Sequence, residues 1–174
     1  MRLTGEEIAK EGIITNLGPE SIQQQGVDLR LKSVLRFVWA ESEINESGYI
    51  PATGKTRLPN RTEIEPINMD DKEVFMLSPG YYEVIFDEGC NMPNNRVMDF
   101  ISRSSLVRCG AEIISGQFDA GFKTDNMGCF MAVYQPVQIE RHARVAQTRI
   151  SETSPVKDDN MYNGQWQNDK QRKC

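Results

Sequence analysis

The sequence is poor in the residues that build metal sites. Its 174 residues include one histidine, His142, and four cysteines, and none of them has the spacing of a metal-binding motif. Cys90, Cys109, Cys129 and Cys174 are therefore predicted to be free thiols, and no structural zinc site is expected. His142 is predicted to occupy a turn.

Excess positive charge is also missing. The chain has 20 basic and 25 acidic side chains, a net charge of -5, so it lacks the overall field that attracts nucleic acid or anionic lipid. Any phosphate that it binds must be held locally. No apolar run approaches a membrane span, and the first residues contain no apolar signal core. We expect a cytoplasmic protein.

Long helical periodicity is absent, and β-branched and aromatic residues instead form short runs between turn residues. The predicted strands cover residues 34–40, 80–86, 96–102, 112–118, 128–134, 137–140 and 144–150. Such a series is typical of an all-β jelly roll or a related barrel. One short helix is predicted at the start, because Thr4 and Glu7 form a capping box and Gly12 provides the stop.

The length predicts one domain over residues 1–155, with residues 156–174 as its tail. Residues 41–72 are rich in Asn, Gly, Pro, Thr and charge, which indicates a long insertion with one exposed hairpin and no evident role. The tail is polar, with only Tyr162 and Trp166 as anchors, and we expect it to be disordered unless something holds it.

Two neighbouring segments carry the chemistry. Arg103, Ser104 and Ser105 place a planar guanidinium beside two hydroxyls, donors that suit phosphate oxygens. Asp119 stands in a short apolar strand that breaks at Gly121, where a carboxylate is able to position or deprotonate a water. Each segment alone also fits a plain turn. Together they indicate nucleotide chemistry.

Several segments in a fixed order resemble one family, the superfamily of dUTP diphosphatases and dCTP deaminases. The matching segments are QGVDLRL at 25–31, SRSSLVR at 102–108, FDAGFK at 118–123, ARVAQ at 143–147 and YNGQ at 162–165. They span nearly the whole chain, and the last one resembles the nucleotide-closing segment of the deaminase branch.

The resemblance implies roles for particular residues. Asp119 is the implied catalytic carboxylate, and Asp28 either supports the site or contacts the ligand. The implied phosphate-binding residues are Arg103, Ser104, Ser105, Arg108, Gln147, Tyr162 and Gln165. The implied base- and sugar-binding residues are Ser115, Gly116, Gln117 and Phe122. Arg144 and Arg149 are interpreted as surface charges.

The resemblance also implies a distorted jelly roll that assembles as a homotrimer, with each active site built from more than one subunit. The implied ligand is a deoxynucleoside triphosphate with Mg²⁺. This ion is expected to be held mostly by phosphates and waters, so no protein ligand for it is predicted.

The chain departs from the deaminase pattern at one informative position. In the deaminases a glutamate follows the motif-three aspartate by ten residues and moves protons, whereas this chain has Cys129 there. A buried cysteine usually behaves as a small hydrophobe, so deamination is disfavoured. The segment 114–117 is also atypical, which leaves the preferred base open.

Three functions from different classes therefore remain at this stage. Hydrolysis of dUTP to dUMP and pyrophosphate is favoured. The alternatives are a dCTP deaminase or bifunctional deaminase and diphosphatase, and a nucleotide-binding relative without catalysis. A hydrolase for another modified deoxynucleotide also fits.

Overall fold

A computed structural model describes residues 1–38 and 48–167 of the chain. The chain begins with helix α1 (Gly5–Glu11), which has the predicted caps. The hydroxyl of Thr4 accepts a hydrogen bond from the backbone of Glu7, whose carboxylate accepts one from the backbone of Thr4. Gly12 ends the helix in the left-handed region, at a φ of 64°. The predicted N-terminal helix is confirmed.

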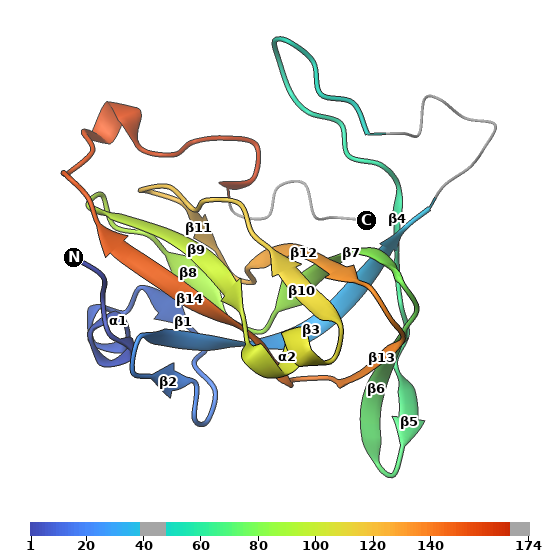
Figure 1. Cartoon of the computed structure of the whole chain (residues 1–174). Coiled ribbons are helices and arrows are strands. Elements are labelled where there is room, and N and C mark those ends of the chain that lie inside the picture. The colour runs from blue at the N-terminus through green and yellow to red at the C-terminus, as the bar shows by residue number, and fades with distance from the viewer. Residues whose placement is uncertain (39–47, 168–174) are drawn as a thin grey trace.

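Antiparallel strands make up the body of the molecule (Figure 1). The main sheet has the order β10-β12-β7-β3-β14-β9, and β2 and β4 pair with β3 outside this path. Its strands are β2 (Ile22–Gln23), β3 (Gly26–Phe37), β4 (Arg61–Glu63), β7 (Gly80–Phe86), β9 (Arg96–Ser102), β10 (Ala111–Ile114), β12 (Gly128–Val133) and β14 (Arg144–Glu152). This architecture confirms the predicted all-β jelly roll.

Two smaller sheets complete the fold, with the orders β1-β8-β11 and β13-β6-β5. Their strands are β1 (Ile14–Thr15), β5 (Ile67–Met69), β6 (Lys72–Leu77), β8 (Gly89–Asn91), β11 (Lys123–Thr124) and β13 (Val137–Glu140). Helix α2 (Ser104–Arg108) follows β9, and a short 3-10 helix (Asp158–Asn160) lies in the C-terminal segment. No helix within the described ranges has the length and apolar character needed to cross a membrane.

A row of aromatic rings connects the core with the C-terminal segment. The centroids of Phe100 and Phe118 are 4.7 Å apart, those of Phe118 and Phe122 5.1 Å, and those of Phe122 and Tyr162 5.3 Å. Phe86 packs edge-on against Phe100 at the core end of this row. Such packing stabilises an aromatic cluster beyond the area it buries, and it fixes the ring of Tyr162 against the core.

The predicted strands at 80–86, 96–102 and 137–140 match β7, β9 and β13 to the residue. The strand predicted at 112–118 is shorter, because β10 ends at Ile114. Beyond it the hydroxyl of Ser115 accepts a hydrogen bond from the backbone of Phe100 at 3.1 Å, so a side chain replaces the ladder. Helix α2 has no side-chain cap at Arg103, and the sequence therefore contains no start signal for it.

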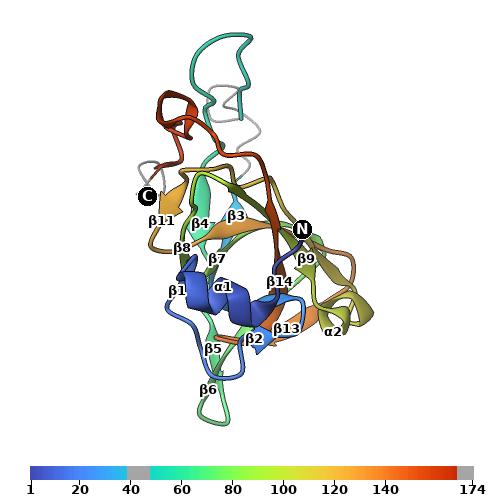
Figure 2. The same ribbon diagram turned by 90° about the vertical axis from the view of Figure 1, so that its left-hand side faces the viewer.

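The segment 48–60 and the C-terminal segment lie at the same end of the molecule, opposite the β5–β6 hairpin (Figures 1 and 2). This hairpin spans residues 67–77, so it only begins within the predicted insertion 41–72, and its turn residues Asp70 and Asp71 have φ values of 51° and 62°. Inside the insertion, Tyr49 and Arg57 form an isolated antiparallel bridge. Residues 41–47 of the predicted insertion lie outside the described residues. The predicted turn at His142 is confirmed, with a φ of 66°.

Candidate active site

The loop between β10 and β11 places Asp119 at the rim of a cavity. Phe118, the preceding residue, is buried and exchanges two backbone hydrogen bonds with Met98, of 2.7 and 3.0 Å. Because side chains alternate along an extended chain, Asp119 points away from the core and is exposed. The side-chain amide of Gln117 donates to Oδ1 of Asp119 at 2.7 Å. Backbone pairing and a side-chain bond thus orient this carboxylate.

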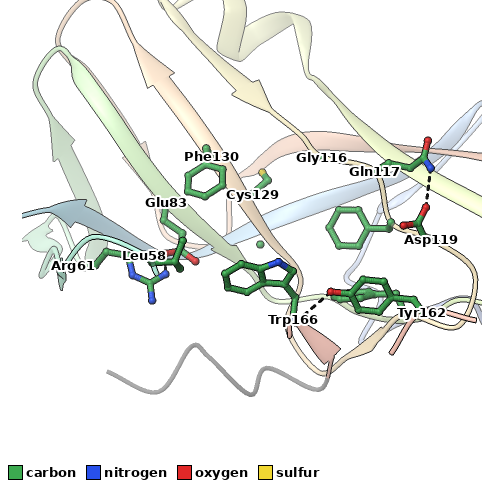
Figure 3. A pocket seen from close by; sticks show the side chains of 13 residues that line it. Leu58, Arg61, Glu83, Gly116, Gln117, Asp119, Cys129, Phe130, Tyr162 and Trp166 are labelled. Carbon is green, nitrogen blue, oxygen red and sulfur yellow. Dashed lines mark hydrogen bonds and ion pairs between the residues drawn. The ribbon is translucent and has the colours of Figure 1, made fainter. Parts of the chain in front are cut away.

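A cavity of about 290 Å³ opens on one side of Asp119, and five aromatic side chains contribute to its walls (Figure 3). The lining residues are Leu58, Arg61, Glu83, Gly116, Gln117, Phe118, Asp119, Phe122, Gly128, Cys129, Phe130, Tyr162 and Trp166. They include most of the predicted base and sugar residues. Ser115 does not line this cavity, since its hydroxyl donates to the carbonyl of Gly116 at 2.6 Å and supports β9 instead.

A second cavity, of about 580 Å³, opens on the other side of the same carboxylate. Gln117, Asp119 and Tyr162 line both cavities, and the second one also has Arg96 and Asn160 in its wall. Asp119 therefore lies between an aromatic cavity and a more polar one. This is a suitable position for a group that acts between the base and the phosphates of a nucleotide.

The C-terminal segment is held on the fold as far as Gln167. The backbone of Tyr162 donates to the carbonyl of Ala120 at 2.8 Å, and the side chain of Gln167 donates to the carbonyl of Gly121 at 2.9 Å. Trp166 donates its backbone N–H to the hydroxyl of Tyr162 at 3.2 Å. The loop that carries Asp119 thus holds the tail, a contact that the sequence did not identify. Residues 168–174 lie outside the described residues.

Gln165, a predicted phosphate ligand, has another set of partners in this structure. Its side-chain oxygen accepts from the backbone N–H of Thr56 at 3.1 Å, and its side-chain nitrogen donates to the carbonyl of Thr56 at 3.3 Å. The segment 48–60, whose role the sequence did not show, therefore anchors the tail beside the cavity.

Two of the predicted phosphate-binding residues, Arg103 and Gln147, form a second cluster around Asp28. This carboxylate is 1% exposed, and its Oδ2 lies 3.3 Å from Nε of Arg103 and 3.6 Å from Nη1 of Arg144. Gln147 donates to Oδ1 at 3.2 Å. Burial raises the pKa of Asp28, against the opposite effect of the two guanidinium groups and Gln147. This geometry favours the supporting role for Asp28, which orients Arg103 and Gln147.

Arg144 was not expected in this cluster. The prediction that it is only a surface charge is wrong, because it lies at Asp28 and donates to the carbonyl of Glu20 at 2.7 Å. Arg149 does pair on the surface as expected, through two hydrogen bonds of 2.7 Å to Asp99. Arg144 is difficult to distinguish from Arg149 in the sequence, because both lie in β14 and only the register separates them.

The two halves of the predicted site lie apart within the described part of the chain. Ser104, Ser105 and Arg108 are exposed on α2, next to the Asp28 cluster through Arg103. Of the residues that the structure describes, none of the second-motif set lines either cavity at Asp119. The structure thus does not bring the second-motif residues together with the residues that line the cavities at Asp119.

Two charged residues in the aromatic cavity were missed by the sequence. Arg61 of β4 and Glu83 of β7 form an ion pair there, and neither belongs to a recognisable motif. Among the described residues, Cys90, Cys109 and Cys129 remain thiols outside any disulfide, as predicted, whereas Cys174 lies outside the described residues. Cys129 is 5% exposed and also lines this cavity.

A family model described as dCTP deaminase-like matches residues 3–153. The chain belongs to this family. One relative is the deoxyuridine 5'-triphosphate nucleotidohydrolase of Methanocaldococcus jannaschii, which is 35% identical over 143 residues, covering 82% of this chain and 85% of the relative. A probable deoxyuridine 5'-triphosphate nucleotidohydrolase of Halobacterium salinarum is 31% identical over 153 residues, covering 87% of this chain and 86% of the relative.

Among solved structures, the 2'-deoxycytidine 5'-triphosphate deaminase of Agrobacterium tumefaciens has the same fold. It superposes with a TM-score of 0.62 at 18% identity over 88% of this chain. The present chain spans 48% of the length of that protein. The family resemblance stated from the motifs is thereby confirmed.

Proposed function

We propose that this member of the dCTP deaminase-like family hydrolyses dUTP to dUMP and pyrophosphate. The observation that carries the proposal is the orientation of Asp119 by Gln117 between two cavities, in a chain whose relatives are named deoxyuridine triphosphate nucleotidohydrolases. Such a carboxylate suits the activation of water, which is the only nucleophile that hydrolysis needs.

In the proposed reaction, Asp119 accepts a proton from a water whose oxygen attacks the α-phosphorus. The bond from this phosphorus to the oxygen that bridges to the β-phosphorus breaks, and pyrophosphate leaves. Gln117 holds the carboxylate, and the ring of Phe122 lies against the sugar. Tyr162 and the tail exclude bulk water from the site, as closing segments generally do.

The proposed site is completed by a second subunit of a homotrimer. The separation of the Asp28 cluster from Asp119 supports this arrangement, because Arg103, Ser104 and Ser105 of one subunit are exposed or half-buried donors without a place in their own cavity. A neighbouring subunit would bring them to the phosphates bound at Asp119. Closed point-group symmetry, as in a trimer, is usual for soluble homo-oligomers.

Mg²⁺ is the proposed cofactor. Within the described ranges, no three His, Cys, Asp or Glu side chains come together as ligands of a metal ion. The described side chains therefore fit an ion that arrives with the triphosphate and keeps several of its own waters. When bound, the ion neutralises charge on the phosphate oxygens, while Arg103 and Gln147 provide hydrogen-bond donors.

Cys129 separates this function from the second candidate, deamination of dCTP. Cys129 is 5% exposed, and its thiol stands at the position where the resemblance implies the proton-moving glutamate of the deaminases. A panel of dUTP, dCTP, dTTP and their ribose analogues with Mg²⁺ tests the assignment, with pyrophosphate and ammonia measured together. We expect pyrophosphate from dUTP without ammonia from any nucleotide. Ammonia from dCTP would establish a deaminase, and binding without product a non-catalytic relative.

A further inference from the structure

The aromatic cavity contains an ion pair that the proposed reaction does not use. Arg61 and Glu83 bond through Nη1 and Oε2, and their side chains are only 9% and 8% exposed. Burying two charges costs more desolvation free energy than an exposed pair does, and a buried pair generally adds little stability over apolar residues of similar size. A stabilising role is therefore a poor explanation for its position in a cavity wall.

The pair lies at the far side of the cavity from the reacting group. Figure 3 shows Arg61 and Glu83 on one side and Asp119 with Gln117 on the other, with the rings of Phe130 and Trp166 in the intervening region. In a deoxynucleotide the base and the α-phosphate lie at opposite ends of the sugar. A nucleotide with its α-phosphate at Asp119 therefore directs its base towards the ion pair.

The side chain expected to recognise the base is already engaged elsewhere. The side-chain amide of Gln117 donates to Asp119 at 2.7 Å, and the hydroxyl of Ser115 donates to the backbone carbonyl of Gly116 in the same loop. The five aromatic rings in the walls of the cavity suit contact with the faces of a base and do not distinguish its edge. Arg61 and Glu83 are charged groups on the side that the base reaches.

We propose that the Arg61–Glu83 pair recognises the hydrogen-bonding edge of the pyrimidine base. A guanidinium only donates hydrogen bonds and a carboxylate only accepts them. With the base held in one position, the pair matches uracil, whose 4-carbonyl accepts from the guanidinium and whose ring N3–H donates to the carboxylate. It mismatches cytosine, which presents an amino group and an unprotonated ring nitrogen at the same two places. The inference rests on the proposed function, since it assumes that a nucleotide occupies this cavity.

Residues outside the family motifs build this recognition site. Arg61 pairs in register with Phe37 of β3, and Glu83 with Leu35 of the same strand, so Arg61 reaches diagonally across β3. Leu58, from the segment just before β4, lines the same side of the cavity. The segment 48–66 therefore provides base selectivity in addition to its anchor for the tail.

The test compares the wild type with Arg61→Met/Glu83→Leu, a double variant that replaces the charges by apolar groups of similar size. The measured quantity is the ratio of kcat/KM for dUTP to that for dCTP. The fraction of folded enzyme affects both values equally and cancels. We expect the ratio to fall by at least about tenfold, because a pocket without polar groups discriminates weakly between such bases. The matched control is Arg141→Met/Glu73→Leu, an ion pair of 2.9 Å outside the cavity, which should leave the ratio unchanged.

A single variant, Glu83→Gln, tests the direction of recognition. The amide of the variant adds a donor where the carboxylate only accepts, so the ratio of kcat/KM for dUTP to that for dCTP should also change. A folded double variant with the wild-type ratio would overturn the inference, and so would a wild-type ratio near one.

Calorimetric titration with α,β-imido-dUTP and α,β-imido-dCTP separates the two proposals. If the wild type releases no pyrophosphate but binds one analogue at least about tenfold more tightly, and the double variant loses this preference, the proposed function fails and the base recognition stands. If pyrophosphate is released and the preference survives in the double variant, only the base recognition fails. Absence of binding to both analogues would overturn both.

Discussion

Gln117 donates a hydrogen bond of 2.7 Å to the carboxylate of Asp119, two residues further along the same loop. The bond fixes which oxygen of Asp119 stays open towards the cavities. The two backbone hydrogen bonds between Phe118 and Met98 hold the loop on the core. Together with the bond from Gln117 they orient the exposed carboxylate. The catalytic proposal depends on this arrangement.

Asp119→Asn should retain nucleotide binding and lose turnover. The amide preserves the shape of the side chain and its bond to Gln117, but it does not accept a proton from water. We expect kcat to fall by roughly two to four decades, with little change in the affinity for a non-hydrolysable triphosphate. Steady-state kinetics and calorimetry measure the two effects. Asp125→Asn, which alters a carboxylate outside both cavities, is the control. A variant with most of the wild-type kcat would exclude Asp119 as the base.

Two inactive variants should restore activity when they assemble together. Asp119→Asn lacks the base and Arg103→Gln lacks the phosphate donor, but a mixed trimer contains sites with both native residues if they come from different subunits. Co-expression with different affinity tags and purification through both should yield mixed trimers with roughly a third of wild-type activity, because one of their three sites has both native residues. Mixed trimers as inactive as either parent would mean that each site is built within one subunit. The mass of the isolated assembly, measured by light scattering, checks the trimer itself.

The stability of the protein should depend on pH through Asp28. Burial raises the pKa of this carboxyl above its value in the unfolded chain, so its contribution to folding is most favourable at low pH. That contribution is lost as the pH rises through the native pKa. Asp28→Asn does not titrate, so the unfolding free energy of the variant relative to the wild type should increase from about pH 4 to pH 7. Urea denaturation across this range measures it. A difference that is constant with pH would contradict the assignment.

The sequence predicted those parts of the molecule that short-range chemistry determines. The capping box of Thr4, the left-handed stop at Gly12 and the strand at 80–86 depend on neighbouring residues, and all are present. The position of Asp119 was also predicted, but only through its motif. Short-range patterns do not report which strands pair, and the missed residues all depend on pairing.

The ion pair in the cavity illustrates this limit. Arg61 and Glu83 meet because β4 and β7 both pair with β3, at Phe37 and Leu35. Nothing within the sequence around Arg61 sets this register. The same holds for Arg144, which reaches Asp28 because β14 pairs with β3 across a bulge.

Gln165 has two possible partners, and a pair of variants distinguishes them. Its amide bonds the backbone of Thr56 in this structure, whereas the family resemblance implies a phosphate. Gln165→Ala should raise KM severalfold under either role. Thr56→Pro removes the backbone donor but keeps the carbonyl that accepts from Gln165, so it should reproduce part of the effect if Gln165 serves as an anchor. An increase in KM for Gln165→Ala alone, with Thr56→Pro at the wild-type value, would assign Gln165 to the phosphates.

Docking of the tail should control catalysis more than folding. A methyl group at Gly121 would lie 2.8 Å from Cβ of Met161, and the φ of 85° at this glycine is strained for any other residue. Gly121→Ala should therefore displace the tail at the point where Tyr162 binds Ala120. Removal of residues from Met161 onward should have the same kinetic effect, a higher KM or a lower kcat, because the water-excluding segment is lost.

The truncated chain gives the cleaner test, because it does not strain the Asp119 loop. It should keep the trimer and most of its thermal stability, since Tyr162 is the one tail residue that packs on the buried core cluster within the described ranges. Bound triphosphate with Mg²⁺ should slow proteolysis after Lys157 in the full chain. Contacts between the tail and the phosphates then offset the conformational entropy that the tail loses when it is ordered. Nucleoside alone should not protect. If the truncated protein hydrolyses dUTP with unchanged kcat and KM, the tail is a passive end, and the contacts of Tyr162 and Gln167 with the Asp119 loop have no role in the reaction.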